Sequence, residues 1–242
     1  MKRLIAAIGF ITFLPTGRKT VYDPVGMIPF FPVVGLLLGA ILAGIDAAAG
    51  LFWELPVVSL IDVAALVLLT GALHLDGLGD TADGLFGHHD RLRALAIMKD
   101  SRVGAMGLVV VVLGLTLKWA GIWGLDSDRS LCLLLVPAYA RGAMIFAIRF
   151  LEYGRPEGGT GHPLFSAPLS AASFAGMLLP VAASFFAGAL AIRLNLAFVL
   201  FTAAVILFYR RRIGCVTGDM LGAMVEATEV FLFLVLAAGG GQ

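Results

Sequence analysis

The chain has 242 residues, of which 60% are hydrophobic and only 14% are charged, and its formal net charge at pH 7 is +1. A mean hydropathy of +0.99 excludes an ordinary soluble globular domain. We therefore predict one integral membrane domain over residues 1–242, an all-α polytopic helical bundle. The net charge says nothing about partners, and from the membrane class we expect surrounding lipid and no nucleic acid.

The first 13 residues combine Lys2 and Arg3 with an apolar stretch. This pattern fits either a secretory signal or a helix that lies on the membrane surface. No small-residue cleavage site follows, and Pro15 and Thr16 interrupt the stretch. We therefore expect an N-terminal interfacial helix.

Hydropathy next predicts about seven transmembrane helices. Their ranges are 30–53, 56–73, 103–125, 130–150, 170–192, 195–209 and 220–238. With the N-terminus in the cytoplasm, the segments on that side hold most of the cations: Lys2, Arg3, Arg18, Lys19, Arg91, Arg93, Lys99, Arg102, Arg149, Arg155, Arg210, Arg211 and Arg212. The opposite side receives only Arg129 and Arg193, so the charge pattern favours this topology and keeps the short sixth helix.

Three aspartates follow the second predicted span: Asp76, Asp80 and Asp83. On a helix their spacing of i, i+4 and i+7 places all three within about 60° of one face. Like charges at this spacing repel unless a cation lies between them. The small residues Gly77 and Gly79 between them would let a ligand or another helix approach the backbone. Solvated loop aspartates are the alternative reading.

Cations follow in the same predicted cytoplasmic loop, where Lys99 and Arg102 precede the third span. Carboxylates that hold Mg²⁺ and cations that grip phosphate are the parts that phosphoryl transfer requires. Two more cations, Lys118 and Arg141, lie inside predicted spans. Arg141 cannot lose its charge and needs a phosphate or carboxylate partner, whereas Lys118 could also extend toward the membrane surface.

A second acidic pair opens the last predicted span, where Asp219 and Glu226 share one helix face two turns apart. An ionised Glu226 in an apolar helix costs on the order of 2 to 3 kcal/mol without a partner. We expect that partner to be a metal ion, Lys118 or Arg141. Glu229 points to a different side of the helix and ranks below the other two acids.

Other polar residues are expected to have supporting roles. Asp46 and Asp62 lie toward the opposite membrane side, where they fit polar contacts between helices. On an unbroken helix His74 stands about 160° from Asp76, so it could act as a base only if the helix breaks just after it. Asp83, which lies farthest along the acidic face into the loop, is the preferred candidate for the general base, and His74 is its rival.

Taken together, these motifs resemble the cobalamin synthases, which are adenosylcobinamide-GDP ribazoletransferases. The resemblance runs nearly from end to end and is most specific in the His-x-Asp-Gly-x-x-Asp-x-x-Asp-Gly pattern and the Lys-Asp-Ser-Arg motif. The matching segments are Phe10 to Pro15, Phe31 to Gly35, His74 to Gly84, Met98 to Arg102, Arg141-Gly142 and Thr217 to Glu226. The chain departs from the family in Gly214-Cys215-Val216, where a glycine pair is common, and in the prolines Pro156 and Pro163.

The resemblance implies a Mg²⁺-dependent enzyme of the inner (cytoplasmic) membrane. It would join adenosylcobinamide-GDP to α-ribazole or α-ribazole 5'-phosphate and release GMP, at the end of cobalamin biosynthesis. The implied metal ligands are Asp76, Asp80, Asp83, Asp219 and Glu226. The implied phosphate-binding residues are Lys99, Arg102, Lys118 and Arg141. Asp76, Asp80, Asp83, Lys99 and Arg102 would act in catalysis, and a homo-oligomer is compatible with this picture.

Two other functions stay open. A CDP-alcohol phosphotransferase also uses membrane aspartates and a metal, but its motif requires Ala-Arg soon after Asp-Gly, where this chain has Asp80-Thr81. An ion-coupled transporter should show matched halves with interrupted helices. This chain instead gathers acids and phosphate-type cations on one predicted membrane side.

Overall fold

The computed structural model describes residues 1–17, 23–87, 90–126, 128–155 and 158–238, so Arg18, Lys19 and Pro156 lie outside the described residues. Within those ranges the regular secondary structure is helical, apart from one isolated parallel bridge between Tyr153 and Val216, and loops join the helices. The prediction of an all-α protein is confirmed.

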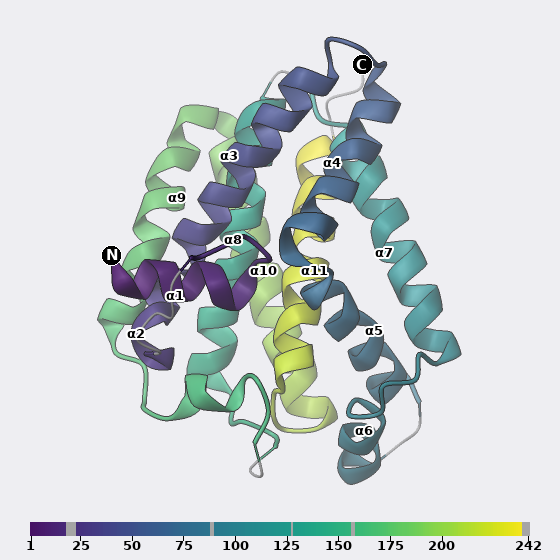
Figure 1. Ribbon diagram of the computed structural model, residues 1–242, viewed down its shortest axis with the longest axis vertical. Helices are drawn as coiled ribbons and strands as arrows, with labels where there is room; N and C mark the ends of the chain where they lie inside the picture. The colour runs from purple at the N-terminus through teal and green to yellow at the C-terminus, as the bar shows by residue number, and fades with distance from the viewer. Residues whose placement is uncertain (18–22, 88–89, 127, 156–157, 239–242) are drawn as a thin grey trace.

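Seven longer helices build the bundle (Figure 1). They are α3 (Phe31–Ala49), α4 (Leu55–Thr70), α5 (Leu73–Leu85), α7 (Ala105–Trp123), α8 (Arg129–Phe150), α10 (Ala189–Arg212) and α11 (Gly218–Ala237). The shorter elements are α1 (Lys2–Ile11), α2 (Pro24–Met27), η1 (Ile28–Phe30), α6 (Arg91–Ile97), η2 (His162–Phe165), η3 (Ala171–Met177), α9 (Leu178–Ser184) and η4 (Phe185–Ala187).

Among the described residues, five helices are long and apolar enough to cross a membrane, and the bent pair α4–α5 makes a sixth if it counts as one span. The short predicted helix 195–209 is part of α10, which has 24 residues. The predicted helix 170–192 is instead divided among η3, α9 and η4. Gly188 separates η4 from α10 with a non-helical backbone conformation, φ 55° and ψ −122°. Residues with a side chain rarely adopt this conformation, so a glycine suits the position.

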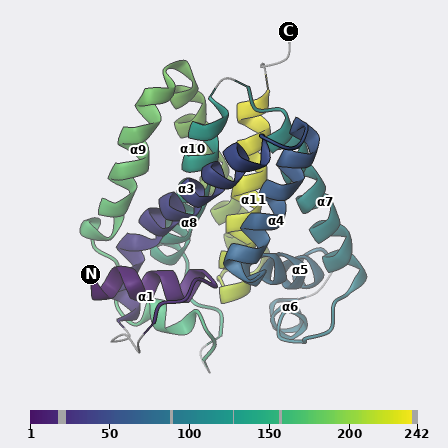
Figure 2. The ribbon, with the colours of Figure 1, turned by 45° about the horizontal axis from the view of Figure 1, so that its top comes forward.

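The bend between α4 and α5 positions the acidic segment. Gly71 and Ala72 both adopt left-handed conformations, with φ of 59° and 58°, and the two helices meet at 91°. The helix therefore breaks before His74, and the predicted helix through Asp76, Asp80 and Asp83 is confirmed. Figures 1 and 2 show α5 turning away from α4 to run beside the end of α11 where that helix begins.

The core lies around α8 and α11. In their most apolar stretches 83% and 67% of the residues are buried, against 22% in α7 and 28% in α10. α3 packs closely on α8 because Gly35 and Gly39 face its backbone at Pro137 and Leu134, where a Cβ atom would not fit. α7 and α10 present apolar side chains outward, as expected of helices in contact with lipid. α1 lies across the long helices near the end of the bundle that carries α5 (Figure 2).

Candidate active site

Two glycines bring α5 and α11 into backbone contact. A Cβ atom on Gly77 would lie 2.6 Å from the carbonyl oxygen of Asp219, and one on Gly222 would lie 3.1 Å from the Cα of His74. Asp219 stands in the first turn of α11, which begins after the N-cap Thr217. The close approach therefore places Asp219 near the aspartates of α5.

Asp80 is the most crowded of these carboxylates. It is half-buried and lies in the electrostatic field of Asp76, Asp83 and Asp219, with Arg155 as the opposing charge. Within the described residues, the side-chain carboxylates of Asp76 and Asp80 form no hydrogen bond or ion pair. Repelling carboxylates without partners fit a site that receives a cation.

Asp83 has a different environment from Asp76 and Asp80. Its two carboxylate oxygens accept hydrogen bonds from the backbone amides of Gly104 at 2.7 Å and Gly107 at 2.8 Å. Gly104 is the N-cap of α7. Asp83 thus anchors the start of α7 and the loop before it, and both of its oxygens are engaged.

Lys99 and Arg102 lie in the loop that Asp83 anchors, and both are exposed. The Nη2 of Arg102 contacts the Oδ2 of Asp100 at 2.6 Å, and this hydrogen bonding lowers the pKa of Asp100 to about 2. Arg102 is therefore paired with a neighbouring carboxylate that is ionised at neutral pH. Their role in phosphate binding stays a prediction.

A cavity of about 220 Å³ opens beside the contact of α5 and α11. Its polar walls include His74 and Asp76 from α5, Gly218 and Asp219 from α11, and Thr160 from the segment before η2. Residues Gly9, Phe10 and Ile11 of α1 close another side. The cavity thus joins four parts of the sequence that the motif analysis treated separately.

The sequence analysis gave no role in the site to Arg155 or Thr160, which lie between α8 and η2. The Nη2 of Arg155 donates to Oδ2 of Asp219 at 2.6 Å, and Thr160 and Gly161 line the cavity. Arg155 entered the sequence analysis only as one of many loop cations. Its position three residues before a glycine pair, in a loop with a further glycine at Gly161, was the available signal.

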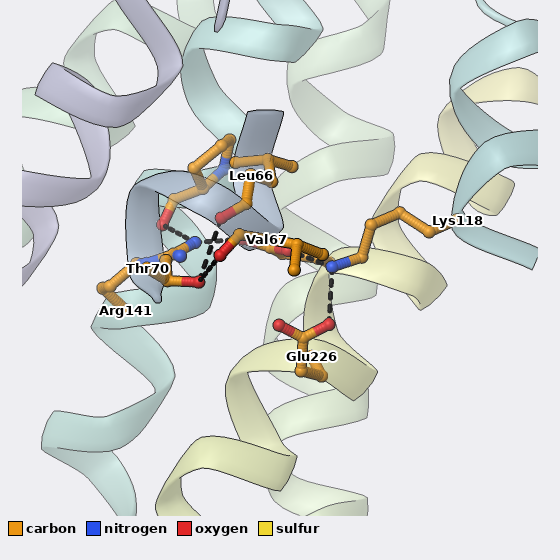
Figure 3. A network of polar contacts seen from close by, with 8 residues as sticks. Leu66, Val67, Thr70, Lys118, Arg141 and Glu226 are labelled. Carbon is orange, nitrogen blue, oxygen red and sulfur yellow. Dashed lines mark hydrogen bonds and ion pairs between the residues drawn. The ribbon is translucent and has the colours of Figure 1, made fainter. Parts of the chain in front are cut away.

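The cations inside the spans have carboxylate partners. Lys118 Nζ lies 2.6 Å from oxygens of both Glu226 and Glu229, and Glu229 also pairs with Arg141. Figure 3 shows the Lys118 ammonium group directed at Glu226, with Arg141 near the last turn of α4. Of the three partners expected for Glu226, the structure pairs it with Lys118, and of the two expected for Arg141 it supplies a carboxylate. Glu229, which ranked below Glu226, is the centre of the network.

This network has consequences for the predicted site. Lys118 and Arg141 are each 1% exposed and Glu226 is 5% exposed, and none of them lines the cavity. The polar contacts given for these three side chains are with one another, with Glu229 and with the Pro137 carbonyl. Their predicted roles in binding phosphate and metal stay predictions.

A similar buried network lies at the other end of the bundle. Arg129 bonds Asp46 through Nε at 2.7 Å and Asp62 through Nη2 at 2.8 Å. These contacts join α3, α4 and α8. The polar helix contacts expected for Asp46 and Asp62 are confirmed.

Among the described residues, no group of three or more His, Cys, Asp or Glu side chains is arranged to hold a metal ion. The five implied ligands are not gathered, because Asp83 bonds backbone amides and Glu226 bonds Lys118. Asp76 and Asp80, with Asp219 nearby, still fit Mg²⁺, which commonly takes one or two carboxylates together with water and substrate phosphates. Asp76, Asp80 and Asp219 therefore fit Mg²⁺, whereas the full set of five implied ligands does not.

Replacing Gly77 by alanine should separate α5 from α11, because the new methyl group would meet backbone rather than a mobile side chain. We expect activity to fall about tenfold as Asp76 and Asp80 move away from Asp219. Gly79→Ala is the matched control, since its Cβ would make only ordinary van der Waals contacts, with Val111 Cγ2 at 3.5 Å and Gly107 Cα at 4.0 Å. Comparing the two turnover rates in lipid tests this contact, and equal rates would contradict it.

Apolar helices that can cross a bilayer, together with a cavity lined by Asp76 and Asp219 at one end of the bundle, define an integral membrane protein with a candidate site at that end. The family model for cobalamin-5-phosphate synthase matches residues 3–237, and the chain belongs to this family.

Curated relatives agree with the family match. The chain is 40% identical over 250 residues to an adenosylcobinamide-GDP ribazoletransferase of Alkalilimnicola ehrlichii, covering 98% of this chain and 96% of the relative. It is 38% identical over 213 residues to the protein of that name from Geotalea daltonii, covering 88% and 86%. For the one from Desulforamulus reducens the identity is 35% over 236 residues, covering 96% and 95%. No solved structure matches the chain significantly.

Proposed function

We propose that the protein transfers the cobinamide phosphate of adenosylcobinamide-GDP to α-ribazole or its 5'-phosphate and releases GMP. The product is adenosylcobalamin or its 5'-phosphate. Family membership and the printed names of the relatives support this reaction. The observation that carries it is that His74, Asp76 and Asp219, from motifs far apart in the sequence, line one cavity.

In this reaction a ribazole hydroxyl attacks the phosphorus that bears cobinamide. A new P–O bond forms, the P–O bond to GMP breaks, and the hydroxyl proton must be accepted. α5 does not break after His74, but His74 and Asp76 line the same cavity, so the unbroken helix does not exclude His74 from the reaction. Its Nε2 has no partner among the described residues, whereas both oxygens of Asp83 accept backbone hydrogen bonds, so His74 is the base in this proposal. Mg²⁺, held by Asp76 and Asp80 with Asp219, would neutralise charge on the phosphates. The exposed cations Lys99 and Arg102 would bind the phosphate oxygens.

We also propose that the cavity faces the cytoplasm across the inner membrane. Counting the bent pair and the apolar segment Ala171–Ala187 with the five long helices gives seven crossings. These place the N-terminus, α6 and the arginine-rich end of α10 on the side of the cavity. Because cytoplasmic segments are rich in Lys and Arg, this side fits the cytoplasm, and the amphipathic α1 fits its lipid surface.

Purified protein in lipid vesicles, supplied with adenosylcobinamide-GDP, α-ribazole and Mg²⁺, should release GMP, and EDTA should stop the release. Absence of GMP would overturn the proposed reaction, and release that is insensitive to EDTA would overturn the metal requirement. A CDP-alcohol donor with a diacylglycerol or inositol acceptor tests the rival transferase. Accumulation of labelled Na⁺ in sealed vesicles tests the transporter.

A further inference from the structure

Arg155 has donor groups that its present contact leaves unused. Its Nη2 bonds Asp219 at 2.6 Å, while its Nε is buried without a hydrogen-bond partner among the described residues. The two side chains are 20% and 23% exposed, so neither is locked in the core. A guanidinium group has five N–H donors in a planar fork, an arrangement that matches phosphate better than a single carboxylate oxygen.

The surroundings of this ion pair also favour an anion. Asp219 and Gly218 begin α11, a helix of 20 residues, and the first amides of a helix have no intrahelical acceptor. Thr217 caps the amide of Met220 at 3.3 Å, which leaves the amides of Gly218 and Asp219 uncapped by that side chain. Gly161 approaches closely, since its Cβ would lie 3.1 Å from Gly218 Cα.

A residue in the wall of the same cavity also has an unpartnered polar atom, independently of the Arg155–Asp219 pair. His74 lines the cavity, is only 2% exposed, and its Nε2 has no hydrogen-bond partner within the described ranges. A buried polar atom without a partner destabilises the protein, because it loses its hydrogen bonds to water. A ligand in the cavity would supply the missing partner.

We propose that Arg155 is a further binding residue for the donor: its guanidinium group exchanges Asp219 for a phosphate of the nucleoside diphosphate. This inference rests on the proposed function. The diphosphate carries more negative charge than the carboxylate and can accept two parallel hydrogen bonds from the guanidinium fork. In the absence of donor, Asp219 holds Arg155 at the cavity and therefore competes with the phosphate.

Binding of adenosylcobinamide-GDP in EDTA, measured by equilibrium dialysis against protein in detergent, separates Arg155 from Asp219. Arg155→Gln should weaken donor binding about 10- to 100-fold, because a charged hydrogen-bonding partner is lost. Arg155→Lys should recover part of the loss. In EDTA, where no metal ion needs Asp219, Asp219→Asn should tighten donor binding, because it removes the carboxylate that competes for Arg155. Binding of uncharged α-ribazole should change less than about twofold in all three variants.

A purely structural role for the pair predicts a different pattern. If Arg155 only ties its loop to α11, Arg155→Gln and Asp219→Asn should both weaken donor and acceptor binding and lower the unfolding temperature alike, and this result would overturn the proposal. Donor binding by Arg155→Gln at the wild-type level would also overturn it. Wild-type protein that binds no donor would refute the proposed function itself.

Discussion

Asp80→Ala is expected to abolish turnover while leaving the folded protein at least as stable as the wild type. Asp80 is half-buried among Asp76, Asp83 and Asp219 and has no hydrogen bond within the described residues, so its removal relieves repulsion. Loss of an electrostatic group at a phosphoryl-transfer site should lower the rate at least about 10²- to 10³-fold. GMP release and the thermal unfolding midpoint, measured on the same preparation, test both parts.

The control for Asp80 is a carboxylate at the opposite end of the bundle. Glu54 is exposed, precedes α4 and makes no side-chain capping bond, so Glu54→Ala should change neither rate nor midpoint. An active Asp80→Ala protein would show that this carboxylate is not needed for the chemistry. An inactive protein with a lower midpoint would show instead that Asp80 stabilises the fold.

Glu229→Leu is expected to be the most destabilising single change in the bundle. Glu229 is fully buried, bonds Lys118 at 2.6 Å and pairs with Arg141. Its removal leaves the Arg141 guanidinium group buried without a carboxylate partner. Loss of one member of a buried ion pair typically costs about 3 to 5 kcal/mol, so the protein should unfold at a much lower temperature in detergent.

Glu226→Gln provides the comparison within the same network. Lys118 would keep its contact with Glu229, and the glutamine amide oxygen could still accept from the ammonium group, so the loss of stability should be much smaller. The ratio of the two effects tests which carboxylate is the centre of the network. Equal losses for Glu226→Gln and Glu229→Leu would contradict the central position of Glu229.

The sequence by itself was sufficient for the membrane class, most of the helices and the helical face shared by Asp76, Asp80 and Asp83. These properties depend on local hydropathy and on the helical repeat, which any segment carries with it. The same local reasoning ranked Glu229 below Glu226 and gave Arg155 no role, because it contains no information about which helices become neighbours.

Only the tertiary structure decided the partners of the charged residues. The turn at Gly71 and Ala72 redirects α5, and Gly77 and Gly222 let it reach the backbone of α11. This contact sets Asp76 and Asp80 beside Asp219, whereas the packing of α7 and α8 on α11 commits Lys118 and Arg141 to its glutamates. Charges far apart in the sequence are paired by helix packing, and the free energy of burying them depends on those partners.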